Sequence, residues 1–203
     1  MNRSFSRASA FGALAVIAAT GCGGGGAVSS MEYPGAARRP ATPADVAFMT
    51  GMIPHHAQAV LFAGWAESHG ASRAIRVLCE RIVVGQRDEI AAMRNWLRSH
   101  GQPVPPAEYV RMGMGMEHGH EMMAGMLTEE QLSELDAARG PEFDRLFLTY
   151  MIPHHQGAVM MVDELFASFG GAQDDLVFKI ASDISADQTT EIERMQSMLD
   201  AMN

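Results

Sequence analysis

The run Met52-Ile53-Pro54-His55-His56 returns 99 positions later as Met151-Ile152-Pro153-His154-His155. In each copy an Asp stands ten residues before the first His, as Asp45 and Asp144. A second repeated segment follows at an offset of 102, with the matching pairs Gln86/Gln188, Glu89/Glu191, Ile90/Ile192, Met93/Met195 and Leu97/Leu199. Two copies are too few for a solenoid, so the repeat indicates the internal duplication of one helical hairpin.

This doubled motif resembles the family called domain of unknown function 305 (DUF305), whose mark is a duplicated Asp-x-x-Phe-Leu-x-x-Met-Ile-Pro-His-His-x-x-Ala. The second copy fits from Asp144 to Ala158, and the first departs at Met49, where Leu is usual. The resemblance covers about residues 42 to 201. It implies a ferritin-like helical bundle that is exported from the cytoplasm. For some members it also implies copper binding and a link to copper tolerance.

The composition limits the classes of function. With 203 residues, of which 47% are hydrophobic, the chain can bury the core of a single domain. The formal charge of −9 and the lack of a Lys/Arg run argue against a nucleic-acid partner. The chain has 17 Met and 8 His but 2 Cys, so its soft metal ligands are thioethers rather than thiolates.

The first 21 residues predict a targeting segment. Two Arg precede a short apolar run, 8–19, that is too short to span a bilayer as a mature helix. Ala19-Thr20-Gly21-Cys22 resembles the lipobox of bacterial lipoproteins, which would make Cys22 the lipidated first residue; an ordinary cleaved signal is the alternative. Residues 22–41 then form a flexible linker. The sequence therefore predicts an exported envelope protein, periplasmic or on the outer face, anchored to a membrane by lipid.

Apolar residues at steps of three and four predict four long helices and one short one. Capping signals at Thr42 and Thr128 start two of them, and glycines end the first three of the four long ones. The predicted helices are 42–70, 72–100, 128–139, 140–170 and 173–201. We expect one domain, 42–203, whose hairpins 42–100 and 140–201 pack as an all-α, ferritin-like four-helix bundle, with residues 101–139 as the crossover.

The candidate metal ligands inside the bundle are Met52, His55, His56, Met151, His154 and His155. The proline before each His pair sits inside a helix at a cost of about 3 kcal/mol, which suggests that a kink there is used. The helical period places the first His of each pair on the core face and the second about 100° round. A structural interpretation stays open, in which the histidines are buried and hydrogen-bonded to a carbonyl or to Gln86 and Gln188.

Four carboxylates are duplicated along with the histidines: Asp45, Glu89, Asp144 and Glu191. The Glu-x-x-His spacing of di-iron bundles is absent, because Ala92 and Arg194 stand three residues after the two Glu. The sequence favours a helix-start role for Asp45 and solvent-facing positions for Glu89 and Glu191, with metal binding in the bundle core as the alternative.

The crossover holds the sharper metal signal. Residues 111–126 include six Met and two His, and Met at every second position cannot form one helix face. Thioethers suit Cu(I) or Ag(I), and imidazole can also hold Cu(II). The ligands of this predicted capture arm are Met112, Met114, Met116, His118, His120, Met122, Met123 and Met126. The alternative is a low-complexity linker whose Met side chains cover the core or bind proteins.

Together these patterns predict an extracytoplasmic protein that binds and sequesters copper, as Cu(I), Cu(II) or both, for copper tolerance or homeostasis. Silver and zinc are the alternative ions. Two other functions stay open: a ferritin-like metal-dependent oxidase that uses the His pairs with Asp45 and Asp144, and an envelope interaction module without metal. The sequence favours a role without turnover and is compatible with a homo-oligomer.

Overall fold

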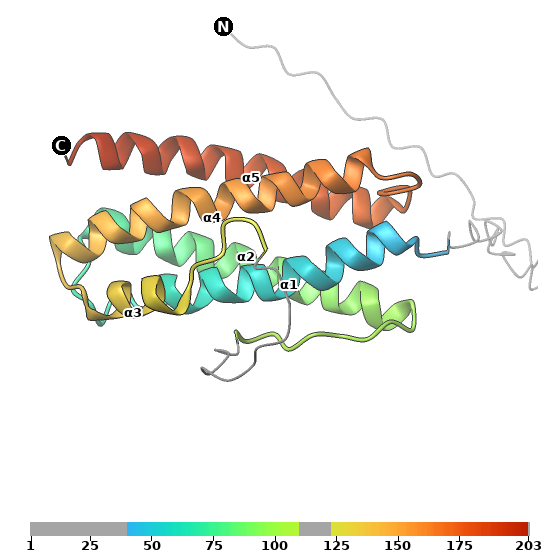
Figure 1. The fold of residues 1–203 in the computed structure, drawn as a ribbon, viewed down its shortest axis with the longest axis horizontal. Helices are drawn as coiled ribbons and strands as arrows, with labels where there is room; N and C mark the ends of the chain where they lie inside the picture. Colours follow the sequence, from blue (N-terminus) through green and yellow to red (C-terminus); the bar gives the residue numbers. More distant parts are fainter. Residues whose placement is uncertain (1–39, 110–122, 203) are drawn as a thin grey trace, which may run out of the picture. The chain divides into compact units, whose positions relative to one another are not determined.

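The computed structural model describes residues 40–109 and 123–202, and this part of the chain is all-α (Figure 1). Its helices are α1 (Pro43–Ala63), α2 (Arg73–Ser99), α3 (Glu129–Ala137), α4 (Pro141–Ala167) and α5 (Asp175–Asp200). The predicted all-α class is confirmed. The predicted signal segment, Cys22 and residues 110–122 of the crossover lie outside the described residues. Within them, no helix is long and apolar enough to cross a membrane.

Side-chain caps start the helices where the sequence predicts. Thr42 Oγ1 accepts a hydrogen bond from Asp45 N at 3.1 Å, while Asp45 Oδ2 accepts one from Thr42 N at 3.3 Å. This is a capping box with Pro43 at the first helical position. Thr128 and Gln131 form the same box at the start of α3. Local sequence is therefore sufficient to place these helix starts.

The first helix is shorter than predicted, because it ends at Ala63 and not at Gly70. After Ala63 the hydrogen bonds shift to a spacing of three residues, from Trp65 N to Phe62 O and from Ala66 N to Ala63 O. Three-residue bonds tighten the backbone into turns rather than continuing the α-helix. The turns carry the chain toward α2 and bury Ala66 in the core.

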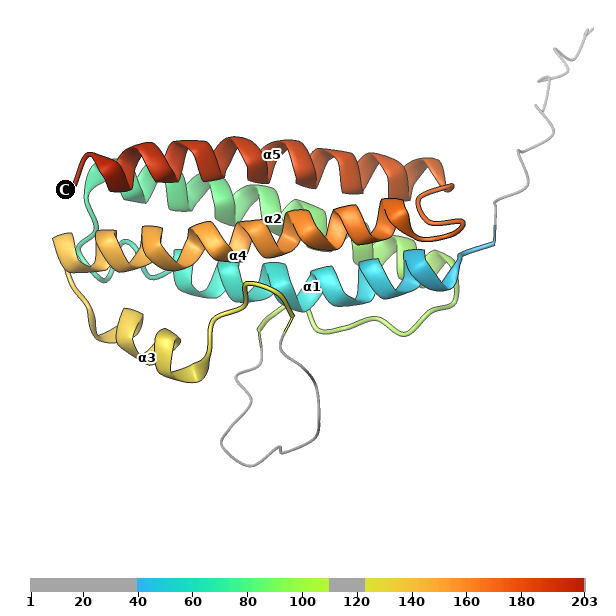
Figure 2. The same cartoon turned by 45° about the horizontal axis from the view of Figure 1, so that its top comes forward.

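The four long helices pack as two antiparallel pairs, α1 with α2 and α4 with α5 (Figures 1 and 2). Helices α1 and α4 also lie against each other and run in opposite directions, and α2 contacts α5. The short helix α3 touches both α1 and α4. The two helices that carry the His-His motifs therefore face each other.

Two clusters of buried side chains form the core. One contains Met52 and Ile53 of α1, and the other contains Met151 and Ile152 of α4. Burying each such side chain contributes roughly 1.5–3 kcal/mol. Because the Met-Ile before each His pair belongs to a different cluster, the His pairs lie where the clusters meet.

The two motif Asp residues tie the hairpins to each other. Asp45 Oδ1 accepts a hydrogen bond from Ala172 N at 2.7 Å, in the turn between α4 and α5. Asp144 accepts from Ser72 N at 3.1 and 3.2 Å, in the turn between α1 and α2. Each Asp thus stabilises the turn of the other hairpin, which for Asp45 is a role beyond the predicted helix start. Both carboxylates are engaged by backbone amides far along the helix from the histidines.

Candidate metal centre

The four motif histidines are fully buried and come together between α1 and α4: His55, His56, His154 and His155 each have 0% of their surface exposed. The rings of His55 and His154 lie 4.0 Å apart between centroids, at an angle of 43°. Within the pairs the rings are 6.3 Å apart on α1 and 6.4 Å apart on α4. The near-equal distances extend the duplication to the geometry of this site, which we call the histidine quartet.

A Glu from the neighbouring helix holds the second His of each pair. His56 Nε2 donates to Glu89 Oε2 at 2.8 Å, and His155 Nε2 donates to Glu191 Oε2 at 2.8 Å. The two Glu side chains are 18% and 15% exposed. The interpretation of these Glu as solvent-facing is therefore wrong. The reason is that α1 packs against α2 as well as α4, and α4 packs against α5 as well as α1. The second His of each pair, about 100° round from the first, therefore points at the helix that carries the Glu.

The first His of each pair has fewer partners. His55 Nε2 donates to the Ala124 carbonyl at 3.1 Å. His154 has no hydrogen-bond partner on either ring nitrogen among the described residues. Gln86 and Gln188 are buried as well, but within the described ranges neither amide has a partner, so they do not hold the histidines. A carbonyl in full hydrogen-bonding geometry is therefore found at one of the four histidines. The backbone of His55 also lies near the His154 ring, where it opposes the lowering of the His154 pKa.

These hydrogen bonds fix which ring nitrogens keep a lone pair. Carboxylates and carbonyls only accept, so Nε2 carries the proton in His55, His56 and His155. Their Nδ1 atoms are buried and lack a partner in the part of the chain that the structure describes, as do both nitrogens of His154. An orphaned buried polar atom costs about 1–3 kcal/mol. Of the five such atoms in this cluster, four carry a lone pair, because one nitrogen of His154 carries the ring proton.

Burial favours the neutral form of three of these imidazoles, those of His55, His154 and His155. Desolvation, followed by charge repulsion from His56, lowers the pKa of His55 to about 3. The pKa of His154 lies well below its ordinary value, again through burial first and then through repulsion from His55. Burial also lowers the pKa of His155, although Glu191 opposes the shift. Neutral imidazoles at neutral pH keep their lone pairs available for a metal ion.

Residues 123–127 of the crossover lie across α1 and α4 beside the quartet, and we call this segment the strap. Gln58 Nε2 donates to Leu127 O at 2.9 Å, and Gln58 Oε1 accepts from Leu127 N at 2.8 Å. On α4, a Cβ at Gly157 would lie 1.9 Å from the Ala124 carbonyl oxygen. Only glycine therefore lets the strap approach the helix this closely.

The sequence reasoning missed the roles of Gln58 and Gly157. The two residues occupy the same position of the repeat, at the offset of 99. The sequence signal for these roles is that the two copies have different residues at this position, although the adjacent His pair is identical. Such a difference indicates that the two halves have different neighbours there. The strap also needs Gly125, which has φ +78° and lies against the Pro153 carbonyl.

The predicted thioether ligands fall in three places. Met52 and Met151 are fully buried in the core clusters, one turn before the His pairs. Met123 reaches from the strap to α1, where its sulfur lies 3.5 Å from the position that a Cβ on Gly51 would take. Met126 is partly buried in the strap. The other predicted ligands lie outside the described residues: Met112, Met114, Met116, His118, His120 and Met122.

A cavity of about 480 Å³ lies between α2 and α5 on the carboxylate side of the quartet. Glu89 and Glu191 line it, together with the buried amides of Gln86 and Gln188. Asp187 lines it as well, and burial, followed by the charges of Glu89 and Glu191, raises the pKa of its carboxyl. The acidic lining favours the approach of a cation.

The donor chemistry of the site fits a soft or borderline ion. Neutral imidazole and buried thioether suit Cu(I) and Ag(I), while imidazole with carboxylate suits Cu(II) and zinc. The described residues contain no cluster of three or more His, Cys, Asp or Glu already spaced to hold a metal. They present two His-Glu pairs and one His-His contact instead. A complete coordination sphere would therefore draw on thioethers as well as imidazoles.

Similar proteins share both the sequence pattern and the fold. Residues 45–199 match the family described as "Domain of unknown function (DUF305)". A DUF305 fragment from Deinococcus radiodurans is 32% identical, with a TM-score of 0.66 over 80% of this chain and 99% of that one. A DUF305 protein from Streptomyces coelicolor is 24% identical, with a TM-score of 0.66 over 78% and 93% of the two chains.

The fold is also similar to that of CopM. In its Cu(II)-bound form CopM is 29% identical, with a TM-score of 0.62 over 78% of this chain and 97% of that one. CopM structures with Cu(I), with silver and without metal match as well. No curated protein sequence matches this chain.

Proposed function

The chain belongs to the DUF305 family, and on that premise we propose that it is an extracytoplasmic copper-binding protein that sequesters the ion at the histidine quartet. One observation carries the proposal: five buried ring nitrogens of the quartet have no hydrogen-bond partner among the described residues. Four of these nitrogens carry a lone pair, because one nitrogen of His154 carries the ring proton. A bound metal ion would use these lone pairs and reduce the cost of leaving them orphaned.

The hydrogen bonds identify the ligand atoms. In His55, His56 and His155 the proton sits on Nε2, so these residues would bind metal through Nδ1. His154 has both ring nitrogens free within the described residues and can present either one. Met52 and Met151 would add thioether sulfur from the turn before each pair.

Glu89 and Glu191 would orient the ligands. A metal-binding His commonly donates its other ring N–H to a carboxylate, which fixes the tautomer and raises the basicity of the ligating nitrogen. The two 2.8 Å hydrogen bonds from His56 and His155 have this arrangement. The same carboxylates line the cavity between α2 and α5, so that cavity is the route by which we expect the ion to arrive.

Copper is favoured over zinc because sulfur accompanies nitrogen in this chain. Thioethers are poor ligands for zinc and good ones for Cu(I). The similarity to CopM supports the same choice, since that protein has been solved with Cu(I), Cu(II) and silver. The bound copper would be buffered or sequestered, which serves copper tolerance or homeostasis.

The proposed location rests on the first 22 residues. We propose that residues 1–21 direct export and that Cys22 carries a lipid anchor, which places the helical domain at a membrane surface outside the cytoplasm. The Met/His-rich residues 112–126 would act as a more accessible arm that captures copper before it reaches the quartet.

The oxidase alternative is less well supported, because the two carboxylates it requires are engaged elsewhere. It would use Asp45 and Asp144, but both accept hydrogen bonds from backbone amides of the opposite turns. The remaining alternative is an interaction module in which the quartet is purely structural. That alternative predicts that metal binding is no stronger than in an unrelated protein.

The test is an anaerobic titration of the purified protein with Cu(I) against a competing chelator, repeated with Zn(II). We expect tight Cu(I) binding that falls sharply when His55, His56, His154 and His155 are replaced by Gln. A His100→Gln variant is the matched control, because His100 is a His outside the quartet. Unchanged Cu(I) binding in the quartet variant would move the site to the arm, and tighter zinc than copper binding would change the ion.

A further inference from the structure

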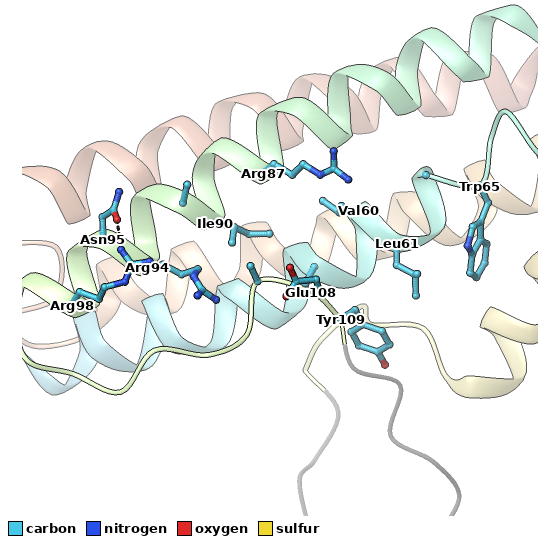
Figure 3. A pocket seen from close by; sticks show the side chains of 14 residues that line it. Val60, Leu61, Trp65, Arg87, Ile90, Arg94, Asn95, Arg98, Glu108 and Tyr109 are labelled. Atoms are coloured by element: carbon cyan, nitrogen blue, oxygen red, sulfur yellow. Dashed lines mark hydrogen bonds between the residues drawn. The ribbon is translucent and has the colours of Figure 1, made fainter.

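A second cavity, of about 720 Å³, lies between α1 and α2, and residues 107–109 complete its lining (Figure 3). Its apolar lining includes Val60, Leu61 and Ile90, and the aromatic rings of Trp65 and Tyr109 border it. This volume is within the range of about 300–1,000 Å³ that is usual for small-molecule sites. The proposed copper site uses none of these side chains.

Three arginines of α2 border this cavity, which we call the arginine groove. Arg87, Arg94 and Arg98 are spaced by seven and four residues, so they share one face of the helix. Figure 3 shows Arg94 and Arg98 at one end of the groove and Trp65 at the other. The site thus combines a cationic end with an apolar and aromatic body.

The three guanidinium groups have no carboxylate partner within residues 40–109 and 123–202. Among the described residues none of them forms an ion pair, although the chain has 24 acidic residues against 15 basic ones. Arg94 Nη1 donates to the Pro105 carbonyl and Arg98 Nη1 donates to Asn95 Oδ1. Glu108 is the one acidic residue in the lining, so three positive groups and one negative group give a formal charge of +2.

The second hairpin has other residues at the positions of these arginines. At the offset of 102 the residues matching Arg87, Arg94 and Arg98 are Thr189, Gln196 and Asp200. At the offset of 99, Glu164 stands in place of Trp65. Helix α5 packs against α4 without any of the groove side chains. The second hairpin therefore lacks both the arginines and the tryptophan that line the groove.

We propose that the arginine groove binds a small oxyanion, a carboxylate or phosphate carried on a flat apolar ring. The guanidinium fork matches both oxyanions through paired N–H donors. The aromatic and aliphatic lining would take the ring, with Trp65 and Tyr109 as its borders. The groove does not depend on copper binding, since it shares no side chain with the quartet.

The test is calorimetric titration of the full chain with 2-naphthoate, 2-naphthyl phosphate and the uncharged 2-naphthylmethanol. We expect saturable binding of one or both anions that weakens as salt is added. Arg94→Gln and Arg98→Asp import the residues of the second hairpin, and each should weaken binding at least about tenfold. The matched control is Arg81→Gln, an α2 arginine in the lining of the other cavity.

The identity of the anion that binds selects carboxylate or phosphate as the recognised group. Equal binding of 2-naphthylmethanol, or unchanged binding in both groove variants with native helix content, would overturn the proposal. The titrations are repeated with chelator present, so that anion binding is measured on the metal-free protein. The result then does not depend on whether the quartet binds copper.

Discussion

The two hairpins carry the same residues at the histidine quartet and different residues on the faces that point away from it. Inside, both copies keep a His pair, and both hold its second His with a Glu at 2.8 Å. Outside, the first copy has a row of arginines that the second lacks. Residues that meet a copy of themselves across α1 and α4 are constrained in both halves, because a change in one must suit the other. Outward residues have no such constraint and can take separate roles.

Acidification gives the largest expected effect on stability. His55 has its pKa lowered to about 3 in the folded protein, so between pH 6.5 and 3 the unfolded chain binds a proton that the folded chain does not. Stability therefore falls as the pH falls. From pH 6.5 to 4 the loss for His55 alone is about 3 kcal/mol, at about 1.4 kcal/mol per pH unit.

Urea denaturation from pH 7 to 4 would measure this loss. His55→Gln should flatten the pH profile, and His154→Gln should do the same from the other hairpin, since its pKa is also lowered by burial. A profile that keeps its slope in both variants would mean that the quartet is protonated in the folded state.

The two Glu-His pairs should contribute equally to copper affinity. Glu89→Gln and Glu191→Gln each remove the carboxylate that orients a His ligand, and each should weaken Cu(I) binding by about ten- to a hundredfold. Chelator competition on the two variants side by side is the measurement. An effect confined to one variant would break the symmetry and place the ion on one half of the quartet.

The strap contacts α1 and α4 through different residues, Gln58 on α1 and Gly157 on α4. A substitution at Gly157 tests the contact with α4. Gly157→Ala would place a Cβ 1.9 Å from the Ala124 carbonyl, and we expect it to lower the free energy of unfolding by about 1–3 kcal/mol. Gly51→Ala on α1 is the control, since its nearest neighbour is the flexible end of Met161 at 3.2 Å. Thermal unfolding of both variants measures the contrast, and equal losses would mean that the strap does not rest on α4.

The smallest expected effect is a change in the free energy of unfolding that distinguishes a metal-binding histidine from a structural one. His154→Leu removes two orphaned nitrogens and should stabilise the metal-free protein by about 1 kcal/mol. His69 is also buried, but its ring is bonded to Ser68 and Asp136, so His69→Leu should destabilise by a similar amount. Denaturation in the presence of chelator compares them. A loss of stability in both variants would support a structural role for the quartet.

The sequence located the helices and the central histidines because the signals are local. The capping boxes at Thr42 and Thr128 lie within four residues, and the helical period places His55 and His154 in the core. The sequence did not predict the burial of Glu89 and Glu191, because that burial depends on how α2 packs on α1 and α5 on α4. The end of α1 was placed too late, since Gly70 is a stronger sequence signal than the turns that precede it.

By itself the sequence determined that this protein is a duplicated pair of helical hairpins with two His pairs and many thioethers. Those features follow from residues within a few turns of each other and from a repeat that can be read directly. The tertiary structure decided which atoms meet: His56 with Glu89 over 33 residues, His155 with Glu191 over 36, and Gln58 with Leu127 over 69. No local pattern encodes these contacts, because they depend on how the hairpins pack. The free nitrogens of the quartet and the arginine groove both follow from that packing.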